Sequence, residues 1–157
     1  MNRTFITQVS GRIESFLGEF AGQKGVFLVD LLIRGQRNNL VVEVFVDGDG
    51  GIDAGTCAEI SRALGKDLDG SVLSGETYTL TVSSPGLDRP LKFPRQYPKH
   101  VGRGISVTLL SGASTTRLLG VLVAAGERSI LVQTESRGEA REIAFEDIVE
   151  AKVEPRW

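Results

Sequence analysis

A proline-rich segment divides this 157-residue sequence into two halves with different hydrophobic patterns. Four of the five prolines fall between residues 85 and 98. Proline fixes φ and removes a backbone N–H donor, so this segment is predicted to form neither a central strand nor a helix. We expect a domain boundary here, with a stiff connector between two small domains. The predicted parts are an N-terminal domain at 1–85, a connector at 86–95 and a C-terminal domain at 96–157.

The first half begins with a predicted amphipathic helix and a β-hairpin. Apolar residues three and four positions apart indicate one buried helical stripe. This stripe consists of Ile6, Val9, Ile13, Phe16, Leu17 and Phe20. Two apolar runs, at 26–33 and 40–47, flank a short polar loop, which is typical of a hairpin. In the second run, Glu43 and Asp47 alternate with the apolar residues and are expected on the opposite face.

A second helix and a third strand complete the predicted N-terminal domain. Asp53 precedes the helix as an expected N-cap, because its side chain can accept from free backbone N–H groups. Cys57, Ile60, Leu64 and Leu68 form the apolar stripe of this helix. Residues 78–82 alternate between apolar residues and threonines, which predicts a half-buried strand. The order αββαβ favours a two-layer α+β domain with both helices on one face of the sheet.

Five short apolar runs separated by turn residues predict a small five-stranded β-barrel in the second half. Gly120 lies inside the second run, where a barrel would have to bend sharply. A turn is expected at 135–138, and one helical turn at 145–148 precedes the last run. The runs are residues 104–110, 117–124, 129–133, 141–144 and 149–153.

The net charge of −2 conceals an asymmetry between the two halves. Residues 1–85 carry a net charge of −4 and residues 86–157 a net charge of +2. The basic segment, defined as residues 86–103, has a net charge of +4. Such a segment beside an acidic domain suggests contact with phosphate, although a solvated surface explains it equally well. Its basic residues are Arg89, Lys92, Arg95, Lys99 and Arg103.

The sequence offers little for catalysis. Cys57 is the only cysteine and lies on an apolar stripe, so we expect a core thiol. His100 is the only histidine and lies among basic residues, where a surface role is favoured over base catalysis. No His and Cys cluster suited to a metal is present. We therefore expect no enzyme activity, cofactor or metal.

Two local patterns resemble binding motifs but fail in detail. Asp47, Asp49 and Asp53 resemble the start of a calcium loop, yet Ala58 stands where that loop needs a glutamate. Turn formation and helix capping explain these residues. Residues 22–25 and 48–51 both match G-x-x-G, the backbone clamp of KH domains. A KH clamp joins two helices, and each of these segments is predicted between a helix and a strand.

The strongest motif is Val82-Ser-Ser-Pro-Gly-Leu-Asp-Arg-Pro-Leu91. Together with Asp-Gly-Gly-Ile-Asp53 and the β-rich segment that follows Gly102, it resembles the RimP ribosome maturation factors. The resemblance covers nearly the whole chain. It implies a KH type II-like N-terminal domain and an Sm-like or SH3-like C-terminal barrel. It also implies a non-enzymatic role in assembly of the small (30S) ribosomal subunit. The implied partners are pre-subunit rRNA and a ribosomal protein near the decoding centre.

The charge pattern suggests how these partners are divided. The basic segment is expected to face rRNA phosphate, and the candidates Glu43, Asp47, Asp49 and Asp53 to attract a basic ribosomal protein. Arg89 has two open roles. It either contacts phosphate, or pairs inside the protein and sets the angle between the domains.

An Sm-like RNA-binding regulator is the alternative function. Sm-like barrels usually work as rings, and the extra domain and stiff connector argue against a ring, so we expect a monomer. The sequence has no run of about 18 apolar residues and no signal peptide, which favours a cytoplasmic protein that contacts no membrane.

Overall fold

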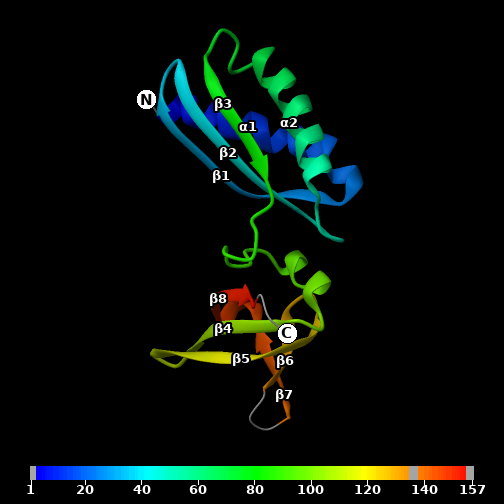
Figure 1. Ribbon diagram of the computed structural model, residues 1–157. Coiled ribbons are helices and arrows are strands. Elements are labelled where there is room, and N and C mark those ends of the chain that lie inside the picture. Colours follow the sequence, from blue (N-terminus) through cyan, green and yellow to red (C-terminus); the bar gives the residue numbers. More distant parts are fainter. Residues whose placement is uncertain (1–2, 135–137, 155–157) are drawn as a thin grey trace. The chain divides into compact units, whose positions relative to one another are not determined.

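The computed structural model describes residues 3–134 and 138–154. The chain divides into two compact units, Met1–Pro85 and Gly86–Trp157, and each has its own hydrophobic core (Figure 1). This division falls at the start of the expected connector, which therefore belongs to the second unit. Separate folding of the two units stays a prediction. No helix in the described ranges is both long and apolar enough to cross a membrane.

The first unit has the predicted αββαβ order. Its three strands form one sheet in the order β1-β2-β3. β1 and β2 pair antiparallel as the expected hairpin, whereas β3 pairs parallel to β2. A parallel pair requires a long crossover, and α2 lies within it. The elements are α1 (Arg3–Phe20), η1 (Gly22–Lys24), β1 (Val26–Gln36), β2 (Asn39–Gly48), α2 (Ala54–Asp69) and β3 (Tyr78–Ser83).

Both helices cover the same face of this sheet (Figure 1). The alternate residues Leu40, Val42, Val44 and Val46 of β2 are buried against them, with at most 1% of any side chain exposed. Each such side chain stabilises the fold by about 1.5–3 kcal/mol. The predicted helix stripes are confirmed, since Val9, Ile13 and Leu17 of α1 and Cys57, Ile60, Leu64 and Leu68 of α2 are buried in the same core.

The start of α2 is set by its predicted N-cap. Asp53 has an extended backbone, and its Oδ1 accepts from the N–H of Thr56 at 2.7 Å. This hydrogen bond lowers the pKa of Asp53, because it stabilises the charged carboxylate. The cap therefore stays ionised, which also suits the positive end of the helix dipole.

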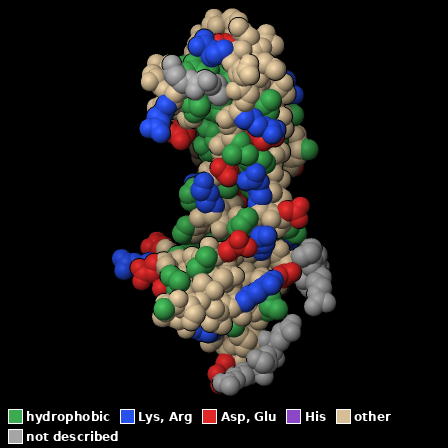
Figure 2. Space-filling view, turned by 90° about the vertical axis from the view of Figure 1, so that its left-hand side faces the viewer, with side chains coloured by type: hydrophobic (Ala, Val, Ile, Leu, Met, Phe, Trp, Pro, Cys, Tyr) green, Lys and Arg blue, Asp and Glu red, His purple; other side chains and the backbone are tan. Residues whose placement is uncertain are grey.

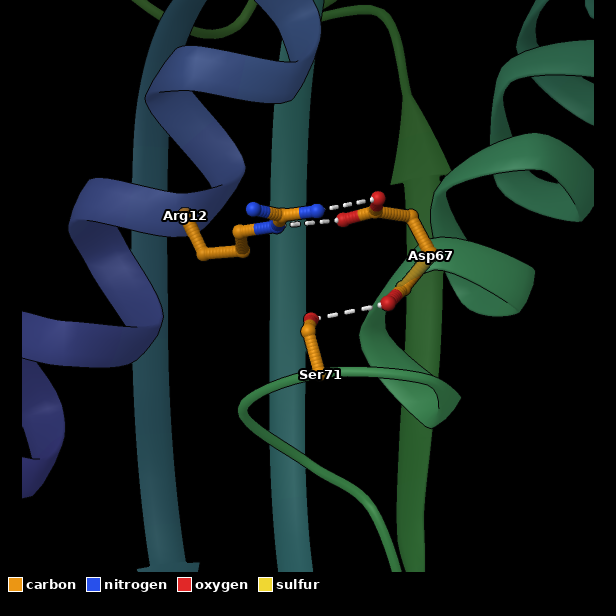
Figure 3. A network of polar contacts seen from close by, with 3 residues as sticks. All are labelled: Arg12, Asp67 and Ser71. Carbon is orange, nitrogen blue, oxygen red and sulfur yellow. Dashed lines mark hydrogen bonds and ion pairs between the residues drawn. The ribbon is translucent and has the colours of Figure 1, made fainter.

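A forked ion pair joins the two helices of the first unit (Figure 3). The Nε and Nη2 atoms of Arg12 donate to Asp67 at 2.8 Å and 2.7 Å. The hydroxyl of Ser71 also donates to the backbone carbonyl of Asp67, at 2.8 Å. The hydrogen bonds from Arg12 lower the pKa of Asp67. Two parallel bonds fix the orientation of the planar guanidinium, so this pair adds a directional contact to the apolar packing that α1 and α2 share.

The second unit contains the five predicted strands. They form one antiparallel sheet in the order β7-β6-β5-β4-β8. A 3₁₀ turn, η4 (Phe145–Asp147), stands where one helical turn was expected. Most of the turn expected at 135–138 lies outside the described residues. The strands are β4 (Gly104–Ser111), β5 (Ser114–Ala125), β6 (Ser129–Thr134), β7 (Ala140–Ala144) and β8 (Ile148–Val153).

The sheet is open, so the predicted closed barrel is corrected. Within the described ranges, β7 and β8 are the two edges and do not pair with each other. Gly120 was expected to allow a sharp bend of a barrel, but the structure gives it a different role in β5. A Cβ atom there would lie 2.4 Å from the carbonyl oxygen of Gln133 on β6 and 2.8 Å from Val132. Only glycine allows β6 to approach β5 this closely.

We expect Asp67→Asn to lower the melting temperature of the first unit at neutral pH. The folded pKa of Asp67 is lowered, so the stabilisation is complete above about pH 5 and is lost as pH falls through that lowered pKa. Thermal melts of the two proteins at several pH values should therefore converge in acid. Glu14→Gln removes an exposed carboxylate from α1 and serves as the control, with a melting temperature close to that of the unchanged chain at neutral pH. An equal difference at every pH would contradict this account.

Candidate functional site

The basic segment is held firmly to the second unit. It contains two 3₁₀ turns, η2 (Pro94–Gln96) and η3 (Pro98–His100). Before them, the N–H of Leu91 donates to the carbonyl of Ala151 in β8 at 2.8 Å. After them, Gly102 donates to the carbonyl of Leu122 in β5 at 2.7 Å, and Leu122 donates back to Arg103 at 2.9 Å. These backbone bonds fix both ends of the two turns on the second sheet.

Gln96 organises the first of these turns from inside. Its side chain is buried, with 1% exposed. Its Oε1 accepts from the backbone N–H groups of Lys92 and Phe93, at 2.7 Å and 2.8 Å. One buried carboxamide thus satisfies two backbone donors that precede the turn, which is the task of a helix cap.

Tyr97 anchors the junction between the turns. Its ring is buried and meets Phe145 edge to face, with 5.0 Å between the ring centroids. Burial raises the pKa of Tyr97 to about 12, so the phenol stays neutral and suits an apolar core. Gln96 and Tyr97 together place the backbone of the basic segment against the second core.

The anchored segment presents its charges outward to different degrees. Lys92, Arg95 and Arg103 are exposed, while Arg89 and Lys99 are half-buried. All five predicted basic candidates therefore lie on one continuous segment of the second unit. In the view of Figure 2, Lys and Arg side chains are interspersed with Asp and Glu in both units. The face shown in that view therefore carries both positive and negative side chains. The basic segment is a local cluster of positive charge along the chain.

The four acidic candidates of the first unit have different surroundings. Glu43 is partly buried in β2 and accepts from Arg34 at 3.1 Å. Asp47 is only 7% exposed, and its Oδ1 accepts from the N–H of Gly48 at 2.8 Å. Asp49 and Asp53 are exposed. Asp47 is thus not the surface group that strand alternation suggested, because its carboxylate helps to form the turn after β2.

The loop at 47–53 is shaped by its backbone. The N–H of Asp49 donates to the carbonyl of Gly25 at 3.0 Å, and Gly51 donates to Gly48 at 2.9 Å. A Cβ atom on Gly48 would lie 2.2 Å from the carbonyl oxygen of Gly51, so this turn requires glycine. Asp47, Asp49 and Asp53 all lie in this loop. The fourth acidic candidate, Glu43, lies about 13 Å from Asp47 along β2. Within the described ranges, no group of three or more His, Cys, Asp and Glu is suited to a metal ion.

Cys57 lies in the first core, as predicted. Its thiol is buried. Burial raises the pKa of Cys57, and the nearby charge of Asp53 raises it further. The reactive thiolate is therefore disfavoured at neutral pH, in keeping with a packing role.

Two comparisons with known proteins identify the family. Residues 16–88 match the family model described as the RimP N-terminal domain. Over 146 residues the chain is 33% identical to the "Ribosome maturation factor RimP" of Cytophaga hutchinsonii, covering 92% of this chain and 86% of that protein. The chain belongs to the RimP family. A second relative with the same name, from Pelodictyon phaeoclathratiforme, is 35% identical over 122 residues, covering 73% of this chain and 70% of that protein.

RimP membership confirms the resemblance found in the sequence and supports a role in ribosome maturation. The family model ends at residue 88, inside the motif that was most informative. The relative from Cytophaga hutchinsonii extends the similarity over 92% of this chain.

Gln96 is the site residue that the sequence reasoning missed. A signal was nevertheless present, because Pro94 and Gln96 occupy the first and third positions of a helical turn. Proline at the first position and glutamine at the third are both typical of a capped helix start. The four prolines suggested a loop and obscured this pattern.

We expect Gln96→Ala to destabilise the second unit by about 1–3 kcal/mol, because two backbone donors would have no acceptor in a partly buried place. Urea unfolding of the full chain, followed by signals of the second unit, would measure this. Gln133→Ala removes an exposed glutamine from β6 and should change stability by less than about 0.5 kcal/mol. Equal effects of the two substitutions would show that the Gln96 carboxamide does not hold the segment.

Proposed function

We propose that this RimP-family chain is a non-enzymatic factor for maturation of the small (30S) ribosomal subunit. In this proposal it binds pre-subunit rRNA and a ribosomal protein near the decoding centre. The main support is the combination of family membership with a basic segment that is anchored at both ends.

The basic segment is proposed as the rRNA contact. Lys92, Arg95 and Arg103 are exposed on a backbone that Gln96 and Tyr97 hold in place. An ordered backbone reduces the entropy cost when the side chains meet phosphate. Phosphate contacts position a protein on RNA without reading its sequence, so they suit a factor that recognises the shape of a pre-subunit.

The loop at 47–53 of the first unit is proposed as the contact for a basic ribosomal protein. Asp49 and Asp53 are exposed there, and complementary charge speeds the encounter of two proteins. Asp47 contributes indirectly by holding the turn, and Glu43 contributes at a distance along β2. We further propose a KH type II-like first unit, an Sm-like second unit and a monomeric, cytoplasmic protein.

Deletion of the gene should impair small-subunit maturation. We expect sucrose gradients to show excess free subunits, with unprocessed small-subunit rRNA in the corresponding fractions. Plasmid-borne wild-type protein should restore the profile. Normal gradients at both low and high growth temperature would refute the proposal.

Replacement of Lys92, Arg95 and Arg103 by alanine should weaken binding to free small subunits and reduce its salt dependence. The slope of log K against log salt should become shallower by about 0.7–0.9 for each phosphate that is no longer neutralised. Titrations at several salt concentrations measure this slope. An unchanged slope would exclude these residues from the rRNA interface.

Two further variants complete this experiment. Arg128→Ala removes an exposed charge between β5 and β6 and should leave the slope unchanged. Arg89→Ala separates the two roles of Arg89. A lower melting temperature with an unchanged slope favours the structural role, which its half-buried side chain supports.

A further inference from the structure

The outer edge of β3 in the first unit is an unprotected strand edge. β3 ends the sheet and pairs only with β2 in the part of the chain that the structure describes. Along its other edge, alternate backbone N–H and C=O groups therefore have no strand partner. The strand Tyr-Thr-Leu-Thr-Val-Ser contains no charge and no proline, and its pairing shows no bulge.

The other sheet edges carry the features that usually prevent strand addition. β1 has a register shift between Leu28 and Asp30. β7 contains Arg141 and Glu142, and β8 contains Glu150 and Lys152. Charges and bulges on edge strands discourage pairing with another chain. β3 is therefore the edge best suited to accept an additional strand.

In the first unit, α2 runs beside β3 (Figure 1). Residues of both elements line a groove on this side of the sheet. Small residues of α2 leave room for a chain to approach. A Cβ atom on Gly65 would meet nothing closer than Leu80, at 3.7 Å. The groove is lined by Ser61, Arg62, Gly65 and Lys66 of α2 and by Tyr78 and Leu80 of β3, among other residues.

The charges around this groove sum to a positive value. Glu76 pairs with Arg37 and accepts from the N–H of Asn38 at 2.7 Å. Asp69 accepts from the hydroxyl of Tyr78 at 2.7 Å, a neutral donor that does not offset the charge of a carboxylate. The cations Arg37, Arg62 and Lys66 therefore outnumber the two carboxylates by one. Arg62 and Lys66 are exposed and form no ion pair with any residue in the described ranges. The groove therefore favours a negatively charged occupant.

We propose that the α2–β3 groove binds an extended acidic segment of another protein, which adds to β3 as a fourth strand. Arg62 and Lys66 lie four residues apart on α2, about 6 Å along the helix axis. Alternate residues of a strand lie about 6.6–6.8 Å apart on one face. Acidic residues at positions i and i+2 of the added strand therefore match the two cations.

The same groove fits RNA and a second copy less well. Single-stranded RNA usually stacks its bases on exposed aromatic rings. Tyr78, the aromatic residue of this groove, is partly buried and its hydroxyl is engaged. Two copies joined through their β3 edges would bring four unpaired cations together, which is unfavourable. The site is separate from the basic segment, so it does not rest on the proposed rRNA contact.

The test uses the ¹⁵N-labelled full-length chain and a blocked eight-residue peptide that alternates valine and glutamate. We expect saturable binding that weakens with salt, with slower hydrogen exchange at alternate amides of β3. Strand addition causes this alternate protection, whereas a purely ionic contact does not. The double variant Arg62→Glu, Lys66→Glu should raise Kd at least about tenfold.

The matched control is Arg3→Glu, Arg128→Glu, which makes the same charge change at exposed positions that do not line the groove and should leave Kd unchanged. A peptide with lysine in place of glutamate should not bind. The proposal is overturned by unprotected β3 amides at saturating peptide or by equal binding of the lysine peptide. It is also overturned if an oligouridylate displaces the peptide from the groove, or if the free protein self-associates through β3.

Discussion

Alternation of side chains along the strands decides what this protein presents to its surroundings. Each sheet residue points to one face or the other, so a strand that must fill a core offers only every second residue to a partner. In β2, the alternate residues Leu40, Val42, Val44 and Val46 fill the core, while Glu43 is partly accessible. In β5, Leu122 is buried while Leu119 and Val121 are exposed. The basic segment and most of the loop at 47–53 lie outside the strands, where this alternation does not limit how many charged side chains face outward.

Sequence periodicity predicts the local elements well. The stripes of both helices, the cap at Asp53, the buried Cys57 and all five strands of the second unit follow from patterns within about 20 residues. Such patterns suffice because each element buries one face in a core. The resemblance carried by residues 82–91 adds the family, which no periodicity contains.

Non-local contacts explain what the sequence left open. The parallel pairing of β3 with β2 joins residues that are far apart in the chain. The second sheet is open because β7 and β8 do not pair within the described ranges, and local patterns do not determine this. Alternation predicted an outward-facing Asp47, yet the turn at Gly48 buries it. Gln96 has its role because the chain folds back over it, and the prolines around it suggested only a loop. The free cations Arg62 and Lys66 emerge once the partners of the neighbouring carboxylates are known.

The parallel pairing of β3 also constrains how the first unit forms during synthesis. The β1–β2 hairpin joins neighbouring residues and can form as soon as Gly48 has left the ribosome. The apolar face of this hairpin is covered by α2 only after α2 has been synthesised. The sheet is complete only when β3, which ends at Ser83, has also left the ribosome. Pairing between distant segments is slow because a long loop must close first. Until α2 has been made, α1 is the helix that can cover Val42, Val44 and Val46, because its apolar stripe packs in the same core.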